Sequence, residues 1–443
     1  MGIKRKSFFT LKNNMFKNNR LIQAINKHDV FSPYIFFPAI LVIYFFLSIF
    51  DFGRIEYFEA HKNILWPILV GLAAYYLAVY AIQRLGWTFP AFGLGFLKGK
   101  TIYFLYLLGI IGLVSYIIML ATGQIGITDE SVRRNLDPKL NFLSSFLWFA
   151  VIFLICYRVI KEKELTSKRK LFYLILLAFV FVAFILMGYR TPIAVMFFTS
   201  LIVFHYIVKR IKTSWLILFM VIIGVSFSLF GLFRIVTEDT TQKFNSREGP
   251  KVEQPREQEE VSKDLELIRK INSTPKWVRA MTGEMVTGRI VVSKIIEHTE
   301  ESGYMYGRLH TGIFSTVLPG EQTSPRMMIT QVVNERTVDE GKYVTRPGRT
   351  TTPTIIGQFF IEGGYIAIAL GFALYGAVLS MIYNQMQRTG VKSYQSLAYG
   401  FVLTIFVISI HTGLLDLVFL LMIAYAIAST SIEQERQKVK AST

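Results

Sequence analysis

The sequence predicts an all-α polytopic membrane protein with about ten transmembrane helices. Hydrophobic residues make up 52% of its 443 residues, whereas charged residues make up only 18%. A soluble chain carries about 25% charged residues. The apolar residues gather in runs of roughly 20, and a helix of that length spans about 30 Å of hydrocarbon. Composition and pattern together therefore exclude a string of soluble domains.

The predicted spans follow these runs in chain order. They cover residues 31–50, 64–82, 101–121, 142–159, 171–187, 191–208, 215–236, 362–384, 396–411 and 413–429. Only a short polar interruption that includes His411 and Asp416 marks the boundary between the last two, so a reentrant hairpin is the alternative there. The single cysteine, Cys156, lies inside the fourth run, so neither an intrachain disulfide nor a cysteine metal site is expected.

The positive charge indicates how the spans are oriented. The chain carries 48 Lys+Arg against 30 Asp+Glu, a formal net charge of +18. Basic residues gather in short loops of one parity, such as Lys161–Lys170 and Lys209–Lys212, and the positive-inside rule places such loops in the cytoplasm. Both termini are therefore expected in the cytoplasm. Nucleic-acid binding is disfavoured, because the charge follows the membrane topology.

This topology divides the chain into five parts. Residues 1–30 form a basic cytoplasmic N-terminus, and no cleavage site of small residues follows the first apolar run, so the first span is expected to be retained. Residues 31–236 hold spans 1 to 7, residues 237–352 form one large extracytoplasmic loop, residues 353–429 hold spans 8 to 10, and residues 430–443 form a cytoplasmic tail.

The large loop is expected to begin with a mobile stretch and to continue with a helix. Residues 238–265 are rich in Glu, Gln, Lys and Pro and poor in aromatic residues, a composition typical of disorder. Arg289 lies on an apolar stripe of helical spacing, where a charge must be paired or must meet an anion. The stripe consists of Val278, Met281, Met285, Val292 and Ile296.

Four further arginines lie at the predicted outer face. Arg190 stands in a tight turn and Arg234 ends the seventh span, so each either marks a function or snorkels to lipid headgroups. Arg346 and Arg349 precede the eighth span together with four threonines. Forked guanidinium donors and hydroxyls suit the oxygens of a pyrophosphate. Anion binding is therefore favoured over a polybasic membrane edge, which belongs to the cytoplasmic side.

The segment Gly303–His310 has the composition of a binding site. Its glycines let a ligand approach the backbone, and Tyr304 and Tyr306 offer flat faces beside Arg308. His310 can carry a proton, although a histidine in a loop is more often simply solvated.

Glu362 stands among apolar residues and glycines where the eighth span begins. Such a carboxylate can act as a general base toward a sugar hydroxyl, and the structural alternative is a salt bridge to one of the arginines. The candidate catalytic residues are therefore Glu362, His310 and Arg308. The candidate substrate-binding residues are Arg190, Arg234, Arg289, Arg346, Arg349, Tyr304 and Tyr306.

Three motifs resemble those of the oligosaccharide repeat-unit polymerases, the Wzy-type O-antigen and capsular polysaccharide polymerases. They are Gly188–Pro192, Gly303–Gly320 with its Gly-x-x-Tyr-Gly and Leu-Pro-Gly pieces, and Thr352–Gly364. The span number and the place of the long loop match as well. The resemblance implies a GT-C-type glycosyltransferase of the bacterial cytoplasmic membrane. It would transfer a growing glycan from undecaprenyl diphosphate, or another polyprenyl diphosphate, to a lipid-linked repeat unit at the outer face.

The resemblance also implies roles for particular residues. Outer-face arginines bind the diphosphate in that family, which carries over to Arg190, Arg308 and Arg349, and less directly to Arg289 and Arg346. The usual Pro-Arg after the Gly-rich stretch is Pro-Gly here, which leaves open whether Arg326 takes its place. The implied partners are the lipid-linked oligosaccharide and membrane lipids, with a chain-length regulator and a flippase as candidate protein partners.

No metal or other cofactor is expected, and two other functions stay open. The first outer loop lacks an Asp-x-Asp pair, and a diphosphate donor already carries its leaving group, so neither a metal nor a nucleotide loop is needed. An O-antigen ligase shares the layout and the arginines and differs mainly in its acceptor. A lipid-linked oligosaccharide transporter should line the inner half of its bundle with cations, and here those halves hold almost no charge.

Overall fold

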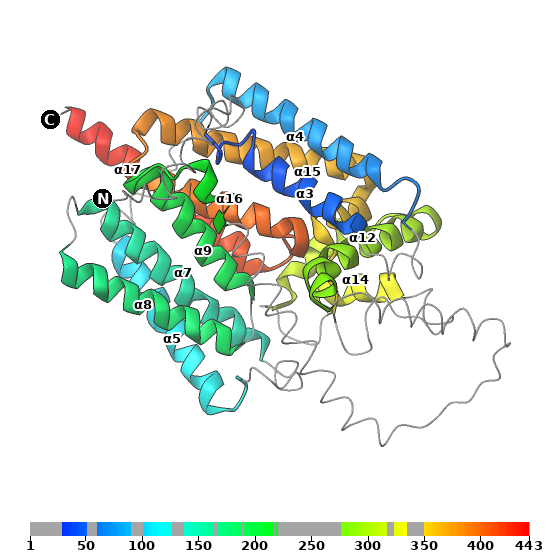
Figure 1. Cartoon of the computed structure of the whole chain (residues 1–443), viewed down its shortest axis with the longest axis horizontal. Coiled ribbons are helices and arrows are strands. Elements are labelled where there is room, and N and C mark those ends of the chain that lie inside the picture. The colour runs from blue at the N-terminus through cyan, green and yellow to red at the C-terminus, as the bar shows by residue number, and fades with distance from the viewer. Residues whose placement is uncertain are drawn as a thin grey trace, which may run out of the picture.

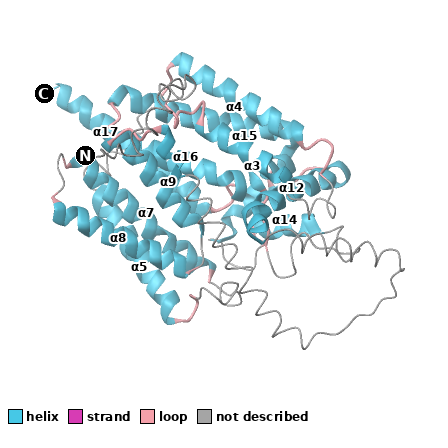
Figure 2. Cartoon of the chain, in the orientation of Figure 1, coloured by secondary structure: helices cyan, strands magenta, loops and turns pink. Residues whose placement is uncertain are grey.

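A computed structural model describes most of the chain. It covers residues 29–50, 60–89, 101–125, 137–162, 166–187, 190–216, 218–219, 276–316, 323–334 and 350–442. All regular structure within these ranges is helical, and they contain no strand (Figure 2). Within them, seven helices are long and apolar enough to cross a membrane, and two shorter apolar helices lie at Phe36–Leu47 and Leu417–Ser429. The prediction of an all-helical polytopic membrane protein is confirmed.

The helices follow the predicted spans closely. The first part of the chain forms α3 (Phe36–Leu47), η1 (Ser48–Phe50), α4 (Leu65–Leu85), α5 (Thr101–Ala121), α7 (Pro138–Lys161), α8 (Ser167–Leu186), α9 (Arg190–Val203) and the π-helix η3 (Phe204–Val208). The second part forms α12 (Lys276–Ser302), α13 (Arg308–Thr311), η4 (Gly312–Thr316), α14 (Pro325–Asn334), α15 (Thr354–Thr389), α16 (Tyr394–Thr412) and α17 (Leu417–Ser442). Among the described residues, each predicted span except the seventh holds a helix; residues 215–236 lie almost wholly outside them.

Helix α16 is the centre of the bundle. It is apolar all round and buried along almost its whole length, as expected of a helix with neighbours on every side. It contacts α3, α7, α9, α15 and α17. In Figure 1, α4 and α15 lie side by side along one edge of the bundle, and α5, α7 and α8 form the opposite edge.

Glycines allow close contacts between helices. A Cβ atom on Gly376 of α15 would lie 2.6 Å from the carbonyl oxygen of Tyr75 in α4. A Cβ atom on Gly112 of α5 would lie 2.8 Å from the Cα of Leu147 in α7. Backbones that approach this closely gain packing energy in a membrane, where hydrophobic burial between helices contributes little.

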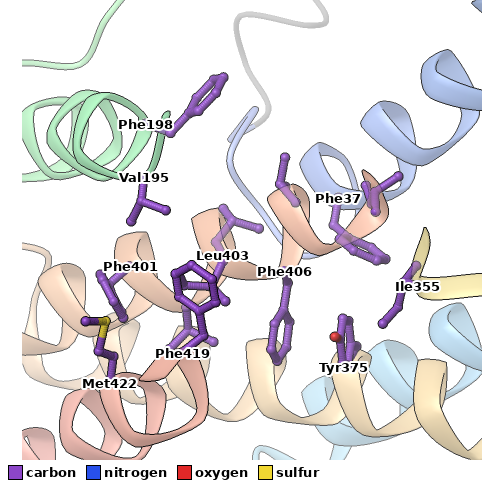
Figure 3. Close-up of a cluster of buried hydrophobic side chains, with 14 of the residues drawn as sticks. Phe37, Val195, Phe198, Ile355, Tyr375, Phe401, Leu403, Phe406, Phe419 and Met422 are labelled. Atoms are coloured by element: carbon purple, nitrogen blue, oxygen red, sulfur yellow. The ribbon is translucent and has the colours of Figure 1, made fainter. Parts of the chain in front are cut away.

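Aromatic rings fill the space between the helices around α16. Tyr375 of α15 stacks on Phe406 of α16 with ring centroids 3.8 Å apart (Figure 3). Phe37 of α3 joins this pair, with its centroid 5.9 Å from that of Tyr375. Further along α16, Phe401 packs against α7, with its ring centroid 5.4 Å from that of Phe149 and 5.1 Å from that of Phe153. This core fixes α15 and α16 relative to each other, and both helices position the site described below.

Polar contacts join helix ends at the two ends of the bundle. At one end, the hydroxyl of Tyr44 in α3 lies 2.9 Å from Nδ1 of His411 in α16. At the other, Asp29 Oδ2 accepts hydrogen bonds from Tyr206 at 2.6 Å and from Tyr383 at 2.9 Å. The residues of each pairing lie at the same end of the bundle, which agrees with the alternating directions of the predicted spans. The end that holds Tyr44 and His411 is called the site end below, and its placement outside the cell stays a prediction.

Helix α15 corrects the predicted start of the eighth span. The helix begins at Thr354, not at residue 362, and the backbone leaves helical geometry at Gly363 and Gly364. Phe359 lies before this break, yet its ring centroid is 6.0 Å from that of Tyr375. In a straight helix the two residues would be about 24 Å apart. The first segment, Thr354–Glu362, therefore folds back toward the second segment, residues 365–389.

The helix predicted within the large loop is confirmed as α12. Of the predicted stripe, Val292 and Ile296 are buried, together with Val286, Ile290 and Ile295. Helix α12 packs against α15, where a Cβ atom on Gly357 would lie 2.8 Å from Cδ1 of Ile295. Figure 1 shows α12 and α14 together at one end of the bundle. The stretch 238–265 lies outside the described residues.

Candidate functional site

The break in α15 is where the large loop meets the membrane helices. The first segment of α15 ends in carbonyl groups that have no partner within the helix. Two backbone amides of the loop satisfy them: Met305 N donates to Ile361 O at 2.8 Å, and Tyr306 N donates to Glu362 O at 3.1 Å. The loop residues 303–307 are thereby fixed against the end of this segment.

Glu362 is the anchor of this junction. Its side chain is only 7% exposed, so its charge must be satisfied locally. Oε1 accepts from the backbone amide of His310 at 2.9 Å and lies 2.8 Å from Nδ1 of the same histidine. Oε2 accepts from the backbone amide of Gly307. Among the described residues, the ionic partner of Glu362 is thus His310 and not an arginine.

The imidazole of His310 is held on three sides by the first segment of α15. Glu362 lies at Nδ1, and the amide nitrogen of Gln358 lies 2.9 Å from Nε2. The ring of Phe359 stacks below, with centroids 6.2 Å apart and planes 11° from parallel. The histidine side chain is nevertheless 38% exposed. The arrangement is a carboxylate–histidine pair that a ligand can reach.

A second polar pair adjoins the first through the loop between α16 and α17. Gln358 Oε1 accepts from the backbone amide of Leu414 at 2.6 Å. Two residues later, Asp416 Oδ2 pairs with Nη2 of Arg326 at 2.6 Å. Helix α14, which carries Arg326, packs close to Gly312, where a Cβ atom would lie 3.3 Å from the ring of Pro325. His310, Gln358, Asp416 and Arg326 therefore belong to one continuous region.

The tyrosines and the arginine of the loop lie at the edge of this region. Tyr304 is 36% exposed and Tyr306 is 81% exposed, and their rings meet edge to face with centroids 6.0 Å apart. Tyr306 takes a left-handed backbone conformation, with φ of 49°, which is uncommon for a residue with a side chain. Arg308 begins α13 two residues before His310 and is exposed. The structure thus brings five predicted residues together: Tyr304, Tyr306, Arg308, His310 and Glu362.

The other predicted arginines are not joined to this region by the described contacts. Arg289 is 8% exposed within α12. Arg190 begins α9, which packs against α16. Arg234, Arg346 and Arg349 lie outside the described residues. In the described part of the chain, no group of three or more His, Cys, Asp or Glu side chains is arranged to hold a metal ion.

Gln358 belongs to this region although it is not among the candidates predicted from the sequence. It stands four residues before Glu362, and side chains at that spacing lie on the same face of a helix. Had the helix been expected to begin at Thr354, this spacing would have placed a buried amide beside a buried carboxylate. Burial of both, at 1% for Gln358 and 7% for Glu362, is the feature that singles them out.

The fold and the site define a class: a multipass helical membrane protein with a carboxylate–histidine pair where residues 303–310 meet helix α15. A family model described as "Putative O-antigen polymerase" matches residues 29–248 and 284–423. The match spans most of the chain, so the protein belongs to the O-antigen polymerase family. Membership implies a glycosyltransferase-type activity that builds polysaccharide in a membrane. Neither a curated protein nor a solved structure matches the chain.

Proposed function

We propose that the protein is a polysaccharide polymerase of GT-C type. It transfers the growing glycan from polyprenyl diphosphate to a lipid-linked repeat unit at the outer face of the bacterial cytoplasmic membrane. The observation that supports this most directly is the partly exposed imidazole of His310, oriented by the buried carboxylate of Glu362. The family match supports the same reaction class.

In the proposed reaction His310 is the general base. Its Nε2 takes the proton from an acceptor hydroxyl while the hydroxyl oxygen forms a bond to the anomeric carbon of the donor glycan. The bond between that carbon and the diphosphate oxygen breaks, and its electron pair leaves with the polyprenyl diphosphate. Glu362 lies 2.8 Å from Nδ1, so it stabilises the imidazolium that forms.

Arginines supply the positive charge for the departing diphosphate. Arg308 is exposed and stands two residues before His310, so it is the described arginine best placed for this role. Arg190, Arg234, Arg289, Arg346 and Arg349 are proposed as further contacts to the diphosphate or the glycan. Guanidinium groups bind such oxygens in a bidentate manner, and these hydrogen bonds strengthen as negative charge develops on the oxygens. No metal is needed for this step.

The exposed rings of Tyr304 and Tyr306 are proposed to bind sugar. They lie at the rim of the His310 region and present two faces at 87° to each other. A tyrosine ring offers a rigid apolar face with a polar tip, which suits the mixed surface of a sugar ring. The membrane lipids surround the helices, and a chain-length regulator and a flippase remain candidate protein partners.

The cellular role is tested by the lipid-linked intermediates that accumulate without this protein. A strain that lacks the gene is expected to accumulate single lipid-linked repeat units at the outer leaflet. The measurement is mass analysis of the polyprenyl-linked oligosaccharides, with an impermeant glycosidase to assign the leaflet. Repeat units confined to the inner leaflet would instead show a transporter, and long lipid-linked chains outside would show a ligase.

Replacing Arg308 by alanine is expected to lower the polymerisation rate by about 30-fold or more, as charge-assisted bonds to a phosphate contribute roughly 2–3 kcal/mol. The measurement is polymer formed per unit of inserted protein. Arg84, an exposed arginine at the end of α4 that stacks over Tyr80, is the matched control. Equal polymer synthesis by the Arg308→Ala and Arg84→Ala variants would remove Arg308 from the site.

A further inference from the structure

The amide of Gln358 can be oriented from its partners alone. The backbone amide of Leu414 can only donate a hydrogen bond, and its acceptor at 2.6 Å is Oε1 of Gln358. The other terminal atom must therefore be the amide nitrogen, which carries two hydrogens. One points to the carbonyl oxygen of Leu414 at 3.4 Å and the other to Nε2 of His310 at 2.9 Å.

This orientation decides which nitrogen of His310 carries its proton. An amide nitrogen only donates, so Nε2 of His310 must accept and must hold a free electron pair. The single proton of the neutral ring is then on Nδ1, where it is donated to Glu362 Oε1 at 2.8 Å. The tautomer that results has its basic nitrogen on the side of Gln358, away from the carboxylate.

The amide of Gln358 is itself buried and closely surrounded. Its side chain is 1% exposed, and Leu414 follows Gly413, whose backbone is left-handed with φ of 69°. A Cβ atom on Gly413 would lie 2.8 Å from Oε1 of Gln358 and 3.1 Å from the ring of Pro353. The bare backbone of Gly413 is therefore what leaves room for the amide.

We propose that Gln358 is a positioning residue for the transfer reaction: it fixes Nε2 of His310 as the proton-accepting nitrogen and holds that place until an acceptor sugar hydroxyl replaces the amide. This inference rests on the proposed function, because it presupposes that His310 is the base. Through the hydrogen bond from Leu414 to Gln358, the loop between α16 and α17 then controls which nitrogen of His310 accepts the proton. The acceptor must therefore reach His310 from the side on which Gln358 and Leu414 lie.

The test compares two substitutions of Gln358 that differ in charge. Gln358→Glu can still accept from Leu414, but it would face Nε2 with a second carboxylate. The imidazole would then stay protonated between the introduced carboxylate and that of Glu362, and it could act as a base only at higher pH. The acidic midpoint of the pH–rate profile is expected to rise by about one pH unit or more. Gln358→Met fills the same space without a donor, so it should lower the rate and leave the midpoint in place.

The assay uses full-length protein in proteoliposomes with the lipid-linked repeat unit extracted from a strain that lacks the gene. Among the described residues, Arg308 lies on the same short helix as His310, and the Arg326–Asp416 pair lies beyond Leu414. They are unchanged in both variants, so a shift of the midpoint belongs to position 358. If position 358 does not face the base during the reaction, both variants would lower the rate without moving the midpoint.

A second substitution approaches the amide from the opposite side and covers the case in which Gln358→Glu does not insert. Gly413→Ala should displace the amide and lower the transfer rate as Gln358→Met does. The double variant Gln358→Met/Gly413→Ala should have a rate no lower than that of either single variant. Gly390→Ala is the control, because Gly390 also ends a helix with a positive φ, of 91°, but has nothing within 4 Å of its Cβ position.

The outcomes separate this inference from the proposed function. A shifted midpoint in Gln358→Glu supports the inference, and non-additive losses in the double variant Gln358→Met/Gly413→Ala show in addition that Gly413 acts through the Gln358 amide. If His310→Ala abolishes transfer while the Gln358→Glu midpoint equals that of the wild type and the Gly413 losses add, the proposed function stands and the inference fails. If His310→Ala transfers at the wild-type rate, both fail.

Discussion

Replacing His310 by alanine is expected to lower the rate of polymerisation by about 10²- to 10⁴-fold, the range that a positioned general base contributes. The reason is local: the imidazole is the exposed member of a pair whose other member, Glu362, is buried and holds Nδ1 at 2.8 Å. Substrate binding should change little, because the glycan and the diphosphate are proposed to contact other side chains. The measurement is the initial rate and the KM for the lipid-linked repeat unit in proteoliposomes.

The chain provides a matched control for His310. His61 also pairs with a glutamate, with its Nε2 3.4 Å from Oε2 of Glu300, but it does not contact the first segment of α15 in the described contacts. His61→Ala is expected to retain a rate within about three-fold of the wild type, since the partner, Glu300, is 54% exposed and stays solvated. A His310→Ala rate above one tenth of that of the wild type would rule out a base at this position.

The helices could be predicted because their signal is local. Runs of apolar residues predicted the bounds of α4, α5, α7 and α16 to within a few residues, because the hydropathy of each run can be read directly from the sequence. The stripe that contains Val292 and Ile296 predicted α12 through its period of 3.6. The start of α15 was misplaced because hydropathy records how apolar a segment is and not its direction. A chain that reverses at Gly363 and Gly364 has the same profile as one that continues.

The residues that lie together around His310 could be named as candidates from the sequence, but their arrangement could not be predicted. Tyr304, Arg308, His310 and Glu362 were each recognisable from residue type and neighbours. The bond between His310 and Glu362 joins positions 52 apart in the chain, and no local pattern encodes it. The amide of Gln358 shows why: its role depends on Leu414, 56 residues further on. Such partners are set by tertiary packing around α16, which a single sequence does not display.

The break in α15 supports the second prediction of large effect. Gly364→Ala is expected to lower the polymerisation rate by more than ten-fold and to reduce thermal stability. Gly364 has φ of 60° and ψ of −140°, a conformation that costs an L residue about 1–3 kcal/mol. The added methyl would also lie 2.6 Å from the hydroxyl oxygen of Tyr304. The backbone at position 364 or the ring of Tyr304 must move to relieve this strain. Either movement displaces the end of the first segment of α15, which carries Glu362 two residues away.

The neighbouring glycine is the control for this prediction. Gly363 has φ of −173°, outside the left-handed region that favours glycine, and its Cβ would lie 3.3 Å from that of Ala367, a tighter contact than usual but without the overlap found at Gly364. Gly363→Ala should therefore remain close to the wild type in melting temperature and in rate. Adding Tyr304→Ala to Gly364→Ala should recover part of the lost thermal stability, because it removes the clash but leaves the backbone strain. If Gly363→Ala and Gly364→Ala lose activity equally, the reversal of the chain at Gly364 does not position Glu362. The histidine would then owe its orientation to the loop alone.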